Sequence, residues 1–474
     1  MAQTKVKIGF LGVGLHTYWQ QFEGLLPRLL SYQNRICAQI SGMDAEVADA
    51  GMVDTPEKAQ AAALMLKQRD VEAVFICVAT YSLSSTVLPV VQQVGKPVIV
   101  LNIQAEPAMN YRAVNSMADR GKMTGEWLAC CQACSVPELA HVLNRAGIRY
   151  DIVTGYYSEN FVWKQVRAWV DAIRAVWGMR NNRLGILGHY YCGMLDVYSD
   201  VTQLNIVFGG QVEYLEMDEL NTLHSEVTGI KLTEKLNEFS TRFEVLPSCE
   251  PGELARAART SAALDRLVES HGLSSLAYYY EGYRENETRN IVTSVVAGTT
   301  LLTGRGIPVA GECEVKNALA MKMLSLLDAG GSFAEFYALD FTDDVVLLGH
   351  DGPAHHSIAE GKVRLVPLPV YHGKPGKGLS IQMRVRKGDI TLLSVCEGPG
   401  GVFLLTAEGE SVEGETLHIG NTNSRYRFPC GVRRFIDRWS KAGPSHHCAI
   451  GIGHKADELT KAAFLLGIPA IVVE

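Results

Sequence analysis

The chain has 474 residues, which is too long for one hydrophobic core, so about three domains are expected. It is 47% hydrophobic and 20% charged with a net charge of -7, as in a water-soluble globular protein. No Lys/Arg cluster indicates nucleic acid or a membrane surface, and no window approaches the roughly 20 apolar residues of a spanning helix. The first residues lack the apolar core of a signal peptide, and the eleven cysteines are scattered. We therefore expect a reduced, cytoplasmic protein that binds neither nucleic acid nor a membrane.

The first third of the chain alternates strand and helix patterns. Apolar runs predict strands, and helical spacing between them predicts helices. The expected strands are 5–11, 73–78 and 97–102, and the expected helices are 18–31, 55–69 and 85–94. This alternation predicts an N-terminal domain over residues 1–150, built on a doubly wound, largely parallel sheet.

A second alternating region and a strand-rich region follow. The central α/β domain is expected over 151–310, with strands 151–153, 183–187, 212–215 and 276–280 and helices 160–177, 232–244 and 250–270. The C-terminal domain, 311–474, has helix 315–329, short strands 363–370, 379–385, 390–396 and 401–406, helix 457–466 and strand 470–473. The predicted fold class is α/β, with two Rossmann-like parallel-sheet domains followed by an antiparallel, β-barrel-like domain.

A glycine-containing loop follows the first expected strand. Residues 8–14 read Ile-Gly-Phe-Leu-Gly-Val-Gly, but Thr17 stands where the last glycine of a dinucleotide-binding loop belongs. No acidic residue clearly closes the unit at the next strand. We interpret the loop as a tight turn between strand and helix, which disfavours an NAD-dependent oxidoreductase.

Two acids and two histidines stand beside turn signals, mostly where apolar runs stop. They are Glu281, Glu312, His350 and His447. Ligands of open α/β sheets gather at the carboxyl ends of strands, and two carboxylates with two imidazoles suit a divalent ion such as Mn²⁺. The pattern alone leaves open that the acids are unrelated surface residues and that the histidines are packing or loop residues.

Other polar residues stand close to these positions or form small clusters. Glu314 and Lys316 follow Glu312 and could orient metal ligands, although polar residues are also ordinary at helix ends. Cys130, Cys131 and Cys134 form one cluster, which we interpret as structural because a single Cys-x-x-Cys is weak support for zinc.

Four short motifs between residues 280 and 454 occur in the same order as in a known protein family. They are Gly-Glu-Cys-Glu-Val-Lys (311–316), Gly-Gly-Ser-Phe-Ala-Glu-Phe-Tyr (330–337), Asp-Val-Val-Leu-Leu-Gly-His (344–350) and Gly-Pro-Ser-His-His (443–447). The L-arabinose isomerase family, whose relatives include the L-fucose isomerases, has Gly-Glu-Gly-Asp-Trp-Lys, Gly-Thr-Ser-Phe-Met-Glu-Asp-Tyr, Asp-Leu-Val-Leu-Gly-Ser-His and Gly-Gly-Ala-His-His in the same order. That family also has a Glu shortly after a central strand, matched by Glu281. The chain resembles a divergent member of this family.

The resemblance implies a reaction and a ligand set. It implies aldose–ketose isomerisation of a monosaccharide, with Mn²⁺, or Co²⁺ or Mg²⁺, held by the four residues named above. Glu281 and Glu312 would also carry the protons, and His446 would line the sugar pocket. It further implies three domains and a homo-oligomer of trimers paired as hexamers, with active sites near subunit interfaces.

Departures from the family pattern concern the sugar pocket. The family's Gln-x-x-His contributes to a neighbouring subunit's sugar site; Gln132 matches the Gln, but Ser135 replaces the His. The family's His-Leu-Tyr is echoed by His16 and Tyr18, with Thr17 between them. The expected substrate is therefore L-arabinose or a related deoxy, branched or substituted sugar. The alternative function is a non-catalytic sugar-binding protein on the isomerase scaffold.

Overall fold

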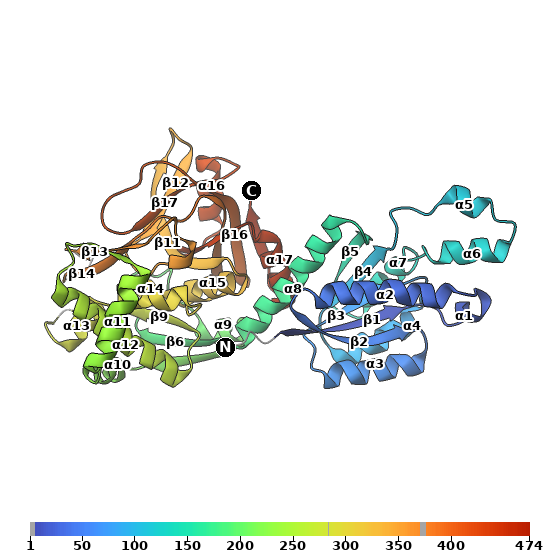
Figure 1. The fold of residues 1–474 in the computed structure, drawn as a ribbon, viewed down its shortest axis with the longest axis horizontal. Coiled ribbons are helices and arrows are strands. Elements are labelled where there is room, and N and C mark those ends of the chain that lie inside the picture. Colours follow the sequence, from blue (N-terminus) through green and yellow to red (C-terminus); the bar gives the residue numbers. More distant parts are fainter. Residues whose placement is uncertain (1–4, 283, 370–375) are drawn as a thin grey trace. The chain divides into compact units, whose positions relative to one another are not determined.

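The computed structural model describes residues 5–282, 284–369 and 376–474 (Figure 1). The chain divides into two compact units, Met1–Trp177 and Gly178–Glu474. Within the described residues, no helix combines the length and apolar character needed to cross a membrane. The two units are taken in turn.

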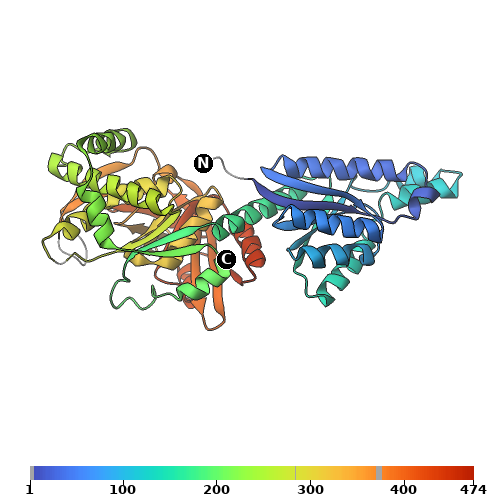
Figure 2. The ribbon, with the colours of Figure 1, turned by 90° about the horizontal axis from the view of Figure 1, so that it is seen from below.

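The first unit is built on a five-stranded parallel sheet. Its strand order is β2-β1-β3-β4-β5, and helices cover both faces (Figure 2). One face packs on α2 and the other on α3, α4 and α7, so the inner strands β1, β3 and β4 are buried from two sides and carry near-continuous apolar runs. The strands are β1 (Val6–Val13), β2 (Ala45–Val53), β3 (Ala73–Val78), β4 (Val98–Gln104) and β5 (Tyr150–Tyr156). The helices are α1 (Tyr18–Gln21), α2 (Leu25–Ser41), α3 (Pro56–Gln68), α4 (Ser84–Val94), α5 (Tyr111–Asn115), α6 (Arg120–Leu128), α7 (Ser135–Arg145) and α8 (Asn160–Arg180), the last of which contains the division.

Three features of this unit differ from the sequence predictions. The helix expected over 18–31 is interrupted at Gly24, whose φ of 80° lies in the left-handed region, so α1 and α2 are separate. Strand β2 was not predicted, because Ala-Glu-Val-Ala-Asp-Ala-Gly-Met-Val has no clear period of two. Strand β5, expected in the central domain, pairs with β4 from Val98↔Tyr150 to Gln104↔Tyr156.

The second unit begins with another parallel sheet. Its strand order is β10-β9-β6-β7, so the prediction of two parallel-sheet regions is confirmed. The strands are β6 (Arg183–Gly188), β7 (Gln211–Leu215), β9 (Ser275–Tyr279) and β10 (Val309–Ala310). The helices of this part are α9 (Val201–Phe208), α10 (Met217–Ser225), α11 (Gly229–Arg242), α12 (Pro251–His271), α13 (Glu287–Val292) and α14 (Val296–Gly304).

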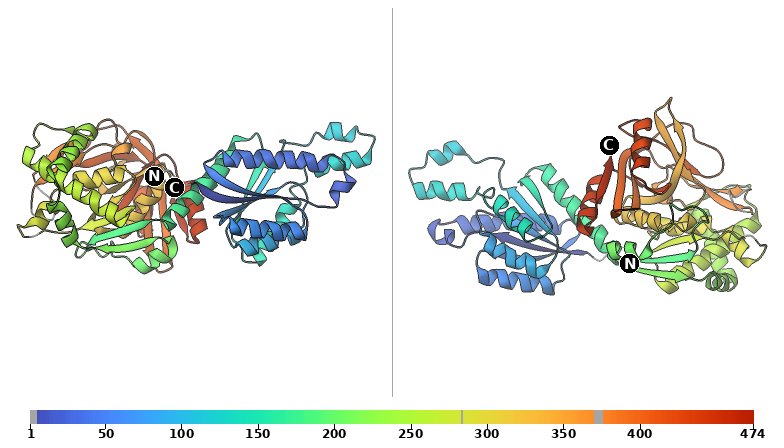
Figure 3. Two further views of the ribbon diagram at one scale, coloured as in Figure 1. Left: turned by 60° about the horizontal axis from the view of Figure 1, so that its bottom comes forward. Right: turned by 180° about the vertical axis from the view of Figure 1, so that it is seen from behind.

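The C-terminal part forms a closed antiparallel ring with appended elements (Figure 3). Strand pairing runs β15-β18-β11-β12-β17-β16, and β15 pairs with β16 to close the ring, as the barrel-like prediction required. Strand β19 adds to β16 in parallel, and β14-β13-β8 form a separate small sheet. The strands are β8 (Glu244–Val245), β11 (Gly330–Asp340), β12 (Val345–His350), β13 (Arg364–Leu368), β14 (Gly378–Gln382), β15 (Gly388–Gly398), β16 (Gly401–Val412), β17 (Thr422–Arg427), β18 (His447–Ile452) and β19 (Ala470–Val473). Helices α16 (Val432–Lys441) and α17 (Ala456–Leu466) and the 3-10 turns η1 (Gly311–Cys313) and η2 (His356–Ile358) complete this part. Val370, at the end of the predicted strand 363–370, lies outside the described residues.

Helix α15 (Val315–Leu326) joins the parallel sheet to the ring. It contacts β9 and β10 on one side and β11, β15 and β18 on the other. Residues 315–324 are all buried, so the helix has no hydrophilic face. Its N-terminus is therefore fixed where the two sheets meet. The domain boundaries at residues 150 and 310 stay a prediction.

Candidate metal centre

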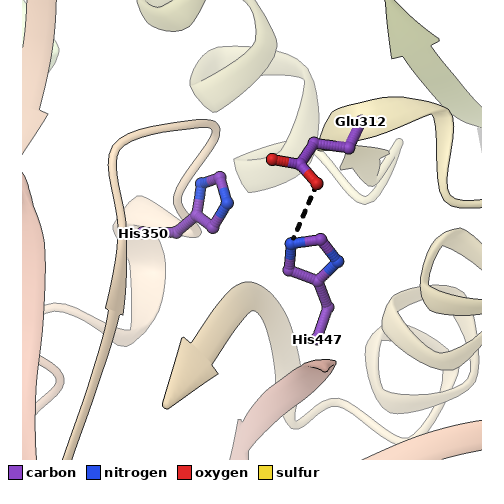
Figure 4. A group of neighbouring side chains, drawn as sticks. All are labelled: Glu312, His350 and His447. Atoms are coloured by element: carbon purple, nitrogen blue, oxygen red, sulfur yellow. Dashed lines mark ion pairs between the residues drawn. The ribbon is translucent and has the colours of Figure 1, made fainter. Parts of the chain in front are cut away.

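Three of the four predicted ligands converge in the second unit. Glu312, His350 and His447 each offer one ligand atom, and these atoms lie within 4.8 Å of one another (Figure 4). Glu312 follows β10, His350 ends β12 and His447 begins β18. The centre therefore combines a strand end of the parallel sheet with two strand ends of the antiparallel ring.

An uncommon backbone conformation presents Glu312. Its φ is 52°, and that of Cys313 is 57°, both in the left-handed region that non-glycine residues rarely adopt. Strain of this kind persists only where surrounding structure imposes it, and it is frequent at functional sites. Here β10 precedes the turn, and the buried α15 follows directly.

The strand register of the ring places the aromatic side chain of Phe333 against both histidines. Strand β11 lies between β12 and β18, with Glu335 opposite both His447 and Gly349. Phe333, two residues earlier, points to the same face of β11. Its ring centroid lies 4.4 Å from that of His447 and 4.6 Å from that of His350. Phe333 thus limits the orientations available to both imidazoles.

Glu314 orients His447. The Nδ1–H of His447 donates to Glu314 Oε2 at 2.5 Å, and the Ser445 hydroxyl donates to Glu314 Oε1. Burial holds the pKa of His447 well below its usual value, so the ring is neutral and its Nε2 carries a lone pair. Burial also raises the pKa of Glu314 to about 7, against the lowering effects of Ser445 and Lys316. A carboxylate that accepts from the far nitrogen is the usual support of a metal-bound histidine.

Two buried atoms, Glu312 Oε2 and His447 Nε2, show whether the cluster suits a metal ion. Glu312 Oε2 and His447 Nε2 are 3.5 Å apart, the contact dashed in Figure 4. Both are buried and lack a hydrogen-bond partner among the described residues. Two buried lone pairs that face each other are costly unless a cation or a proton lies between them. Burial raises the pKa of Glu312 to about 7, and the nearby carboxylates Glu335 and Glu314 act in the same direction. The donor set fits a divalent ion.

His446 and Glu335 extend the cluster toward solvent. Glu335, His446 and His447 form a second group of ligand atoms within 4.8 Å of one another. The Nδ1–H of His446 donates to Asp196 Oδ2 at 2.6 Å, and the His446 Nε2 atom lies 3.8 Å from Glu312 Oε2. Burial lowers the pKa of His446, but Asp196 and the nearby glutamates outweigh burial and raise it. Glu335 belongs to the motif 330–337, but the sequence indicated no role for it or for Asp196.

Lys316 forms hydrogen bonds with the backbone of the segment that contains Asp196. Its Nζ donates to the Asp196 carbonyl at 2.6 Å and to the Tyr198 carbonyl at 3.4 Å, and lies 3.9 Å from Glu397 Oε2. The side chain is buried, so these contacts stabilise its charge. Lys316 therefore connects α15 to the loop before α9.

Glu281 lies just beyond β9, the neighbour of β10 in the parallel sheet. It is half-buried, and its charge, after burial itself, raises the pKa of Tyr279. Its carboxylate is not in the compact groups of ligand atoms that the described residues form. Its role as ligand and proton carrier stays a prediction.

The remaining predicted residues, His16, Tyr18 and Gln132, belong to the first unit. His16 is exposed and Tyr18 half-buried. Gln132 is buried, and its Nε2 donates to the carbonyls of Ala79 and Ala129. Their part in sugar binding stays a prediction.

A pocket opens beside Glu312 and His350. Apart from these two residues and Asp351, its walls are mainly aromatic and aliphatic. They include Tyr191, Tyr278, Tyr279, Val292, Val295 and Val296. A small organic molecule can thus reach the cluster from one side.

Comparison with known proteins agrees with this architecture. Residues 330–469 match the family described as the L-arabinose isomerase C-terminal domain. L-arabinose isomerase 1 of Bacillus licheniformis is 22% identical over 69% of this chain and 67% of its own length. Sulfoquinovose isomerase of Alkalicoccus urumqiensis is 20% identical over 71% and 74%, and L-arabinose isomerase of Herpetosiphon aurantiacus is 21% identical over 71% and 69%.

The fold and cluster define an α/β protein with a Glu/His centre between a parallel sheet and an antiparallel ring. The chain is similar to L-arabinose isomerases along about 70% of its length, and its residues 330–469 match the C-terminal domain of that family.

Proposed function

We propose that the protein is a metal-dependent aldose–ketose isomerase that acts on a monosaccharide. The observation that supports this most strongly is the pair of unpartnered buried atoms, Glu312 Oε2 and His447 Nε2, held by Glu314 behind and His350 beside them. The isomerase names of the relatives support the same reaction class.

The residues that would hold the ion are Glu312, His350, His447 and, by the family resemblance, Glu281. When bound, a divalent ion polarises the sugar carbonyl and stabilises the developing enediolate charge. Mn²⁺ is the ion we expect, with Co²⁺ or Mg²⁺ as substitutes.

The proton transfers fall to the two glutamates. One removes the proton from C2 of the aldose, and the other serves the opposite face or oxygen. His446, close to Glu312 and partly exposed, would contact the sugar.

The substrate is L-arabinose or a related or modified sugar. Relatives named for L-arabinose and for sulfoquinovose indicate that the scaffold accepts sugars of different length and charge. The change of the family's His to Ser135 and the largely apolar pocket wall favour a modified sugar.

The test is an isomerase screen with purified protein, Mn²⁺ and a panel of pentoses, hexoses, deoxysugars and sulfonated sugars. Ketose formation is followed by NMR with and without EDTA. We expect turnover of one sugar that EDTA abolishes and Mn²⁺ restores. Sugar binding without turnover, in protein that retains no metal, would instead support the non-catalytic binding protein.

A further inference from the structure

The cysteine cluster of the first unit contains a close pair of thiols. The Sγ atoms of Cys131 and Cys134 lie 3.4 Å apart, and the Cys131 thiol donates to Cys134. Cys134 is exposed, whereas Cys131 is buried. Among the described residues, no other two thiols are joined by a hydrogen bond between their sulfurs. We propose that Cys131 and Cys134 are a reversible oxidation site. Low-molecular-weight disulfides would oxidise the two thiols to an intramolecular Cys131–Cys134 disulfide.

The backbone around the pair is held from both sides. Gln132 donates to the carbonyls of Ala79 and Ala129, and the backbone N–H of Ser82 donates to the Ser135 hydroxyl at 2.7 Å. The N–H of Ser135 also donates to the Gln132 carbonyl, which closes a turn over residues 132–135. A disulfide needs its sulfurs about 2.05 Å apart. The present separation of 3.4 Å is therefore about 1.4 Å longer than a disulfide bond.

The difference in exposure sets the order of the steps. Cys134 loses its proton and attacks one sulfur of a disulfide RSSR, which releases RS⁻ and leaves a mixed disulfide on Cys134. Cys131 then loses its proton and attacks the Cys134 sulfur, which forms the Cys131–Cys134 bond and releases the second RS⁻. The two protons convert the released thiolates to two RSH. The protein dithiol is oxidised by two electrons, and RSSR is reduced by the same two.

The first step prepares the second. Burial raises the pKa of Cys131, and the hydrogen bond to Cys134 raises it further. Once Cys134 carries RS, the thiol–thiol hydrogen bond and the competing charge are gone. Cys131 then ionises more readily and lies next to the sulfur that it must attack.

Gln132 lies between the two cysteines, so oxidation acts on the segment that carries it. The disulfide closes a short ring around Gln132 and Ala133. The site is independent of the isomerase proposal, since it uses no residue of the metal centre.

The test uses the full-length reduced protein equilibrated in mixtures of reduced and oxidised glutathione. Free thiols are then blocked with N-ethylmaleimide, and peptides are mapped by mass spectrometry. We expect loss of two free thiols per chain, one peptide linked through Cys131 and Cys134, and full reversal by dithiothreitol. Cys131→Ser should instead accumulate glutathione on Cys134, because no second thiol resolves the mixed disulfide.

Cys130→Ser is the matched control, since Cys130 is the adjacent cysteine and should leave the bridge unchanged. A bridge that requires Cys130 would overturn the assignment. So would wild-type protein in which Cys134 takes up glutathione throughout the series without a Cys131–Cys134 link. The wild-type map decides the matter even if a variant fails to fold.

Discussion

At the residue scale, the centre depends on a line of contacts that runs from Ser445 through Glu314 and His447 to Glu312. Ser445 and Glu314 orient His447 through hydrogen bonds, and burial keeps the imidazole neutral. Glu312 differs from the others because it is partly accessible from the pocket. We therefore expect Glu312 to be the member that contacts the substrate.

Replacement of Glu312 by Gln should remove a proton carrier while keeping a side-chain oxygen. We expect kcat to fall by about 10²–10⁴-fold, the usual contribution of a general acid or base. Turnover by NMR and bound metal by elemental analysis are the measurements. Glu410→Gln, at an exposed position of β16, is the control and should retain full activity. Full activity of Glu312→Gln would remove Glu312 from the mechanism.

Replacement of Glu314 by Ala should act through His447. Without its carboxylate partner the imidazole loses its fixed orientation, and we expect metal affinity to fall by about 10–100-fold. Competition with a chelator measures the affinity. Glu314→Gln, which keeps an acceptor for the Nδ1–H, should recover part of the loss. Unchanged affinity in Glu314→Ala would mean that His447 needs no such support.

At the element scale, the centre exists because α15 begins where two sheets end. Apart from β2 and the two-residue β10, the parallel strands were predictable from their apolar runs, as were β15 and β16. The closure of the ring was foreseeable only as barrel-like, because strand pairing between distant segments leaves no local signal. Strands β11, β17 and β18 were not predicted as strands, and with them the position of Glu335 opposite His447.

The sequence indicated some residues of the site but not others. His350 and His447 follow or begin apolar runs, so their place at strand ends was visible in sequence. Asp196 has no such context, and only the fold brings it to His446, 250 residues away.

A histidine between elements gives a stability prediction with a defined pH dependence. His271 ends α12 and contacts Glu213 of β7 at 2.6 Å and Glu219 of α10 at 2.8 Å. The hydrogen bonds to Glu219 and then Glu213 raise the pKa of His271 above its usual 6.5. Its stabilisation is therefore fully present below pH 6.5 and is lost as pH rises through the raised value. The pKa of Glu213 is lowered, mainly by its bond to His271, so the Glu213 contribution is lost only when pH falls below about 4.5.

His271→Gln should accordingly lower the melting temperature more at pH 6 than at pH 9. Thermal unfolding followed by circular dichroism at both pH values measures the difference. His418→Gln, an exposed histidine, is the control and should change little at either pH. A penalty for His271→Gln that is equal at both pH values would contradict the assignment of a charged His271.

At the scale of the whole molecule, the family resemblance predicts a site completed by another subunit. The metal cluster lies in the second unit, and Gln132 lies in the first. If Gln132 contributes to the sugar site of a neighbouring copy, the protein must be an oligomer, which we expect to be a trimer or hexamer.

Mixing two inactive variants tests this prediction. Gln132→Ala should impair sugar binding, and Glu312→Gln should impair proton transfer. If a site uses Gln132 from one copy and Glu312 from another, co-expressed variants should form some intact sites and regain part of the activity. Light scattering gives the oligomeric state of the mixture. A monomer, or no recovery in a mixed oligomer, would place each site within one chain.

The central claim is that Glu312, His350 and His447 hold a divalent ion. The most direct measurement is titration of the metal-depleted full-length protein with Mn²⁺, followed by EPR, beside His350→Ala and His447→Ala. The account predicts one tightly bound ion per chain in the wild type and loss of that ion in both variants, with circular dichroism unchanged. Equal binding in the wild type and the variants, or no binding in a folded wild type, would contradict it.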